Sequence, residues 1–261
     1  EPSAAERAAH VLTHQPHAEW CSVCQRARGR ALPHKVVKDS TPLERNAALF
    51  ELDYSFLGTE AAGYKLTCLN VVDVGVSGGW SVPAVNKGQE DQAIDAVVAF
   101  VRGAGYSSVI LQSDPEHGAM AVVTQACRRL KQLGVNAMER ATPKGAHAAN
   151  GHVERFTGTV SSQVRALLYQ FESRCECTLR AHSELLPWLV RHASWLLFHL
   201  GTSHTAVPAF YKKHGYQWKG SMFEFGERVL CHVAEGERVS TLPKLQSRWV
   251  EGFFLGISTV S

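Results

Sequence analysis

Three carboxylates occupy unusual places in the sequence. Asp53 lies in the middle of an apolar, strand-like stretch, "LFELDYSFLG", where an acid is disfavoured and costly to bury without a partner. Asp114 follows a second apolar run in "VILQSDPEHGA", and Glu154 comes near the start of a long helical pattern. Carboxylate oxygens are the ligands that Mg²⁺ and Mn²⁺ prefer, and a cation offsets the repulsion between grouped acids. If the three acids meet, two bound ions could activate an attacking oxygen and stabilise a leaving one in phosphoryl transfer.

A second group of potential ligands lies in the head of the chain. In "AAHVLTHQPHAEWCSVCQ", His10 and His14 are four residues apart and would share one face of a helix, while Cys21 and Cys24 form a C-x-x-C. This set predicts one tetrahedral Zn²⁺ site, with His17 as an alternative ligand. Redox use of the C-x-x-C is the competing interpretation, and it lacks the βαβ context that such a motif needs.

The elements that must position these residues predict an α/β fold. Three strand-like segments come first, helices and strands then alternate, and helices follow. The expected strands are 48–58, two hairpinned strands within 65–87, 106–114 and 135–141, and the expected helices are 89–105, 119–134, 153–171 and 183–200. In such a mixed five-stranded sheet the first and fourth strands can be neighbours. Asp53 and Asp114 would then project into one cleft at the edge of the sheet.

The three acidic blocks, with "TPKGAHAANGHVERF" as the third, resemble the catalytic blocks of the DDE-type integrases of retroviruses and LTR retrotransposons. In that family one acid lies in a central strand, a second follows another strand before a Gly-containing turn, and a glutamate follows Asn-Gly or Gln-Gly at a helix entrance. Asp53, Asp114 and Glu154 match these positions. The resemblance implies an RNase H-like fold and a polynucleotidyl transferase with two Mg²⁺ or Mn²⁺ ions. Its reactions would be 3′-end processing and strand transfer.

The head is similar to the His-His-Cys-Cys zinc module that precedes the core of integrases, in the same order but with a shorter gap between the pairs. The resemblance implies a zinc module and basic linker at 1–40, a catalytic core at 41–200, and a post-core extension with a small β unit at 201–261. Because the sequence begins at Glu1 rather than Met and stops within strand-like residues, we expect a fragment of a longer polyprotein.

A basic stretch follows the head. The net charge of +3 is too small to prove a nucleic-acid partner, but from Trp20 to Lys38 there are five basic residues and no acid. A solvated linker or helix face predicts the same residues. The candidates for contact with double-stranded DNA are Arg26, Arg28, Arg30, Lys144, Asn150 and Arg155. The resemblance also implies a homo-oligomer that acts in the nucleus, or within a retroelement particle before nuclear entry, and no apolar stretch is long enough to suggest a membrane partner.

Competing interpretations remain at this stage. A domesticated integrase that binds nucleic acid or chromatin without cutting it would keep the same fold. A cut-and-paste DDE transposase would share the acid triad, and the His/Cys head favours the retroelement interpretation. "GVSGG" at 75–79 fits the G-x-S-x-G pattern of esterases, but strand-like sequence follows it where a nucleophile elbow needs a helix. We therefore expect a hairpin turn there.

Overall fold

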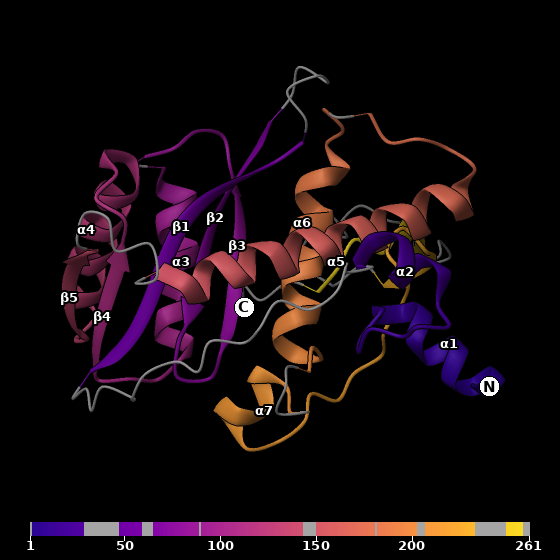
Figure 1. The fold of residues 1–261 in the computed structure, drawn as a ribbon, viewed down its shortest axis with the longest axis horizontal. Helices are drawn as coiled ribbons and strands as arrows, with labels where there is room; N and C mark the ends of the chain where they lie inside the picture. Colours follow the sequence, from indigo (N-terminus) through magenta and orange to yellow (C-terminus); the bar gives the residue numbers. More distant parts are fainter. Residues whose placement is uncertain are drawn as a thin grey trace, which may run out of the picture.

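The computed structural model contains a mixed five-stranded sheet with helices on both of its faces (Figure 1). The structure describes residues 2–28, 47–58, 65–88, 90–142, 150–180, 182–202, 207–232 and 249–257. The strands of the sheet are β1 (Ala48–Leu57), β2 (Leu66–Asp73), β3 (Gly78–Ala84), β4 (Ser108–Ser113) and β5 (Asn136–Ala141). Their spatial order is β3-β2-β1-β4-β5. The predicted fold class, with the first and fourth strands as neighbours, is therefore confirmed.

The direction of the strands divides the sheet in two. β1, β2 and β3 pair antiparallel, as expected for segments joined by hairpins, whereas β4 runs parallel to both β1 and β5. The 75–79 segment joins β2 to β3 as the predicted turn, with Ser77 at a φ of 55°. Because β1 and β4 are parallel, their carboxyl ends meet at the same edge of the sheet, which is where ligands gather in sheets of this kind.

Helices cover both faces of the sheet and extend beyond it. They are α1 (Ala4–Thr13), α2 (Ser22–Arg28), α3 (Asp91–Gly103), α4 (His117–Gln132), α5 (Gly151–Cys175), α6 (Leu185–His199) and α7 (Ala209–His214). Figure 1 shows α3 behind the sheet, and α5 crossing in front of it and continuing to the head formed by α1 and α2. No helix within the described residues is both long enough and apolar enough to span a bilayer.

The alternation of side chains in β1 decides which residues reach the site. Phe50, Leu52 and Tyr54 belong to the apolar core that includes residues of α3 and α4. Their neighbours Glu51 and Asp53 must point to the opposite face, because successive side chains of a strand alternate. That opposite face is covered by α5, which therefore lies over the acidic side chains of β1.

A second apolar core joins α5 and α6 to the sheet. Leu167, Leu189 and Trp195 are fully buried in it. Gly79 allows α5 to approach β3 closely, because a Cβ at this position would lie 2.8 Å from the ring of Phe156. The predicted strand-like tail forms a separate antiparallel pair, β6 (Arg228–His232) and β7 (Trp249–Phe253).

Candidate active site and metal-binding head

Asp53 is half-buried near the middle of β1, on the face that α5 covers. One of its oxygens, Oδ1, accepts a hydrogen bond from the backbone N–H of Tyr54 at 2.8 Å. Burial raises the pKa of Asp53 from 3.8 to about 6; the Tyr54 N–H and the charge of Lys87 oppose this rise, while Asp114 and Glu116 add to it. The charged form of Asp53 is therefore incompletely compensated by its surroundings.

Asp114 directly follows β4. The last pair of the β1–β4 ladder is Leu52 with Ser113, so the next residues along the two strands, Asp53 and Asp114, lie abreast. Asp114 is exposed, and its Oδ1 accepts a hydrogen bond from the Thr142 hydroxyl at 2.7 Å. Strand pairing thus places the two aspartates side by side at the carboxyl edge of the sheet, and their charges act on one another.

Glu154 lies in the first turn of α5 and is exposed. Within the described residues, Asp53, Asp114 and Glu154 do not form a ready-made group of ligand atoms like that of the head. The start of α5 is nevertheless tied to β1, because the Asn150 side chain donates to the Leu52 carbonyl at 3.3 Å. The structure brings the two aspartates together and places Glu154 at the end of the helix that covers the same face.

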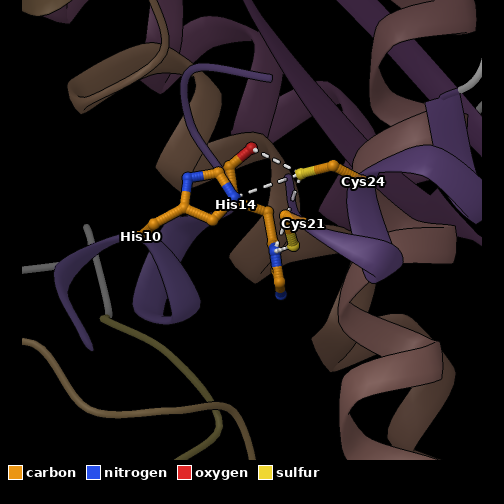
Figure 2. Close-up of side chains that lie close together, drawn as sticks. All are labelled: His10, His14, Cys21 and Cys24. Atoms are coloured by element: carbon orange, nitrogen blue, oxygen red, sulfur yellow. Dashed lines mark hydrogen bonds between the residues drawn. The ribbon is translucent and has the colours of Figure 1, made fainter. Parts of the chain in front are cut away.

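The head places four potential metal ligands close together (Figure 2). The ligand atoms of His10, His14, Cys21 and Cys24 all lie within 4.8 Å of one another, and all four residues are buried. His10 Nε2 lies 3.2 Å from Cys24 Sγ, and His14 Nδ1 lies 3.6 Å from Cys21 Sγ and 3.8 Å from Cys24 Sγ. A tetrahedral Zn²⁺ with ordinary bond lengths separates a sulfur and a nitrogen ligand by about 3.5 Å. The donor set and its spacing fit Zn²⁺, and His17 is outside the group.

Local structure explains how the head forms this cluster. Ser3 and Glu6 make a capping box that starts α1, which carries His10. The i, i+4 spacing predicted a shared helix face if both histidines are helical, but His14 is the C-cap of α1, with its backbone N–H donating to the His10 carbonyl at 2.7 Å. It follows the end of α1 in the left-handed conformation, with a φ of 51°. The chain turns at this residue toward Cys21 and Cys24, and the four predicted ligands gather in one group.

The head packs against the core of the same chain. Gln163 of α5 accepts a hydrogen bond from Gln15 Nε2 at 2.7 Å and donates to the Thr13 carbonyl. Further along α5, Arg165 donates to the Ala27 carbonyl at 3.2 Å. The predicted linker lies mostly in 29–46, outside the described residues. The boundary at residue 40 remains a prediction, but the head and α5 meet directly.

The residues predicted to contact DNA fall into three groups. Arg26 on α2 and Arg155 on α5 are exposed. Arg28 ends α2, whereas Arg30 and Lys144 lie outside the described residues. Asn150 is only 2% exposed, and its amide nitrogen is used on the Leu52 carbonyl. Asn150 therefore has a structural role at the start of α5, where the sequence suggested a DNA contact.

Sequence reasoning missed several polar residues around the aspartates. Lys87 forms an ion pair with Glu116 at 2.6 Å and lies close enough to lower the pKa of Asp53. Glu51 is buried and accepts hydrogen bonds from the first turn of α5. Its position two residues before Asp53 in a strand was a signal, because such residues share a face. No sequence signal pointed to Thr142.

Comparison with known proteins gives a likeness in structure alone. No family model matches the sequence, and no curated protein matches it. The chain is similar to the trimeric form of the HTLV-2 integrase catalytic core domain in complex with magnesium. The sequence identity is 15%, the match covers 64% of this chain and 95% of that one, and the TM-score is 0.44. It is also similar to a chain of the simian T-cell lymphotropic virus intasome in complex with PP2A regulatory subunit B56 gamma, with 14% identity, coverage of 97% and 80%, and a TM-score of 0.47. The BIV integrase catalytic core domain gives 12% identity, coverage of 63% and 92%, and a TM-score of 0.43.

Proposed function

We propose that this chain is an integrase-like, metal-dependent polynucleotidyl transferase that processes the 3′ ends of an element's DNA and joins them to target DNA. The observation that carries the proposal is the register of β1 and β4, which sets Asp53 and Asp114 abreast beneath the start of α5. An acid placed in the middle of a central strand, beside a second acid, has no evident use in folding. It is well placed to hold a cation.

The proposed ligands of two Mg²⁺ or Mn²⁺ ions are Asp53, Asp114 and Glu154. The two aspartates each use Oδ1 in a hydrogen bond, from the Tyr54 N–H and the Thr142 hydroxyl, which orients Oδ2 of each for a ligand. Glu154 is exposed on the first turn of α5, so its side chain is free of packing constraints and can reach a bound ion. When bound, such ions activate an attacking oxygen and neutralise charge on the leaving oxygen.

The protein's own part in the reaction is positioning. A strand holds Asp53 and a strand end holds the exposed Asp114, and a DNA end would be placed against these two carboxylates. No covalent intermediate with the protein is needed, because alignment and charge neutralisation supply most of the catalysis of phosphoryl transfer. Water would attack in end processing, and the freed 3′-hydroxyl would attack the target phosphodiester.

The proposed DNA contacts are made by cationic side chains. Arg155 lies next to Glu154 on α5 and is exposed, so we propose that it contacts a phosphate near the reacting end. Arg26, Arg28, Arg30 and Lys144 are proposed to contact the same DNA further away. We also propose that the chain acts as a homo-oligomer, which would let two DNA ends join one target, and that it acts in the nucleus, where chromosomal DNA is found.

The head is proposed to hold one Zn²⁺ through His10, His14, Cys21 and Cys24. Such an ion would replace a small apolar core, which a segment of this size cannot build. Since the head packs on α5, the ion would also stabilise the helix that carries Glu154.

A DNA-joining assay tests the proposal. Because the terminal sequence of the element is not known, the donor is a pool of short duplexes with randomised ends and the target is a supercoiled plasmid. We expect joined products with Mg²⁺ or Mn²⁺ and none with Ca²⁺ or without a divalent ion. Asp53→Asn, Asp114→Asn and Glu154→Gln should each abolish joining, and the matched control is Asp95→Asn, an exposed acid on the opposite side of the sheet.

The outcomes separate the competing functions. If the wild type joins DNA and the Asp53→Asn and Glu154→Gln variants join it equally well, the assignment of the site is wrong. Binding of the duplexes without any joining by the folded, metal-supplied wild type would instead support a non-catalytic nucleic-acid-binding protein. Sequencing of joined products would also give the preferred donor end.

A further inference from the structure

The start of α5 lacks a cap from its own segment. The first amides of an α-helix have no acceptor within the helix and need one from outside. The N-cap residue, Asn150, makes no side-chain capping hydrogen bond. The acceptor comes from the sheet: Glu51 Oε2 accepts the backbone N–H groups of His152 at 2.9 Å and Val153 at 3.1 Å. A residue about a hundred positions earlier in the chain therefore caps the helix.

Glu51 caps α5 from a buried position. It is 2% exposed, and a buried carboxylate is expensive unless its oxygens are well compensated. Besides the two amides, His152 Nδ1 lies 3.0 Å from Glu51 Oε1. The positive end of the helix dipole adds to the compensation. Gln112, directly opposite Glu51 on β4, accepts a hydrogen bond from Arg140 of β5, so a cation lies in the same row of the sheet.

β1 thus carries both Asp53, an acid of the proposed site, and Glu51, which caps the helix that bears Glu154. Glu51 and Asp53 are two residues apart on one face of β1, roughly 6.6 Å along the strand. Glu154 follows the capped residues His152 and Val153 directly. The Asn150 side chain reinforces the tie by donating to the Leu52 carbonyl, between the two acids of β1.

We infer that Glu51 is a positioning residue, which fixes the first turn of α5 on β1 and so sets where Glu154 lies relative to Asp53 and Asp114. This inference rests on the proposed function. A carboxylate suits the role better than an amide, because both amides of the first turn converge on one of its oxygens while the other oxygen receives the imidazole. Glutamine can present a single carbonyl oxygen to the amides and would lose the negative charge at the helix end.

The test compares Glu51→Ala and Glu51→Gln in the full chain. The readouts are the Kd for Mn²⁺ from calorimetric titration of each folded variant, the Mn²⁺ concentration that gives half-maximal DNA joining, and the rate at saturating Mn²⁺. Removal of a group that orients a metal ligand commonly reduces metal affinity or activity by about tenfold to a hundredfold. We expect a loss in that range for Glu51→Ala, and we expect Glu51→Gln to recover part of it.

Two controls separate positioning from loss of folding. Ser55→Ala changes the residue two positions on the other side of Asp53. Its hydroxyl accepts from Asn70, which also donates to Thr157 in the second turn of α5, so this variant tests a contact to α5 beyond the capped first turn and should keep the wild-type half-saturation. Val101→Ala removes a buried methyl pair on α3 and should lower the melting temperature without moving the half-saturation. If Glu51→Ala itself is unfolded, Glu51→Gln carries the comparison.

The possible failures are distinct. If the wild type joins DNA and both Glu51 variants keep its Mn²⁺ half-saturation and its rate, the positioning role is overturned and the proposed function stays intact. A folded wild type that neither joins DNA nor binds Mn²⁺ in a calorimetric titration would overturn the proposed function and the positioning role with it.

Discussion

Asp53 is expected to weaken the metal-free fold. We predict that Asp53→Asn stabilises the protein at neutral and alkaline pH while it abolishes DNA joining. Burial, together with the charges of Asp114 and Glu116, raises the pKa of Asp53 from 3.8 to about 6. The folded state therefore holds a proton on Asp53 more tightly than the unfolded state does. Stability is lost as pH rises from about 4 through 6, and the loss is complete above that range.

The size of this effect follows from the pKa. A shift of roughly two units, at about 1.4 kcal/mol per unit, sets an upper bound of about 3 kcal/mol of unfolding free energy at pH 8; because Asp53 is only half-buried and solvent screens its charge, we expect about 1–2 kcal/mol. Asn at this position has no charge to bury, and its side-chain oxygen can still accept from the Tyr54 N–H. The stabilisation by Asp53→Asn should thus be about 1–2 kcal/mol at pH 8 and close to zero at pH 4.

The assay is urea denaturation of wild type and Asp53→Asn at pH 4, 6 and 8 in buffer without added divalent ions. Glu19→Gln, at an exposed position between α1 and α2, is the control and should show no such trend. Adding Mg²⁺ at about a hundred times its Kd should stabilise the wild type by about 2.7 kcal/mol and leave the variant unchanged. Equal stabilities of wild type and variant at pH 8, or a difference that persists at pH 4, would refute the reasoning.

Three further predictions concern the head and the second core. Cys21→Ser with Cys24→Ser should reduce bound zinc from about one per chain to none, measured by elemental analysis, and a folded wild type without zinc would contradict the head's role. Burial lowers the pKa of His192 to about 4, so the free energy of unfolding falls as pH drops from 6.5 toward 4. In urea denaturation, His192→Phe should therefore stabilise the protein by about 2 kcal/mol more at pH 5 than at pH 8. An equal stabilisation at both pH values would count against this prediction. Gly79→Ala should cost about 1–3 kcal/mol because its Cβ meets a phenyl ring of α5, whereas Gly103→Ala, with open space around it, should not destabilise the chain.

Much of the sheet could be predicted because its signals are local. The apolar run around Asp53, the turn at 75–79 and the short run before Asp114 each predict a strand or turn from neighbouring residues alone. Adjacency of the first and fourth strands was an expectation from the element order, and the structure confirms it. The two aspartates come together because the parallel register pairs Leu52 of β1 with Ser113 at the end of β4, which sets Asp53 beside Asp114.

The rest depends on contacts between distant residues. In the sequence, Glu51 looks like an ordinary polar residue of a strand, because its hydrogen-bond partners lie about a hundred residues away on α5. The docking of the head likewise relies on side-chain amides such as Gln163, whose type and spacing look like an ordinary helix face. His14 was placed on a helix face by spacing, but the helix ends one residue before it. Periodicity predicts elements; it does not show where an element ends or what it meets.

The most direct test of the central claim is diffraction from crystals of the protein grown with Mn²⁺ and a DNA end, with anomalous data collected at the manganese edge. We predict anomalous peaks at the carboxyl edge of the sheet, bound by Asp53, Asp114 and Glu154 at near the roughly 2.1 Å that Mg²⁺ takes with oxygen ligands. Manganese found elsewhere, or none at this edge in a complex with bound DNA, would contradict the account.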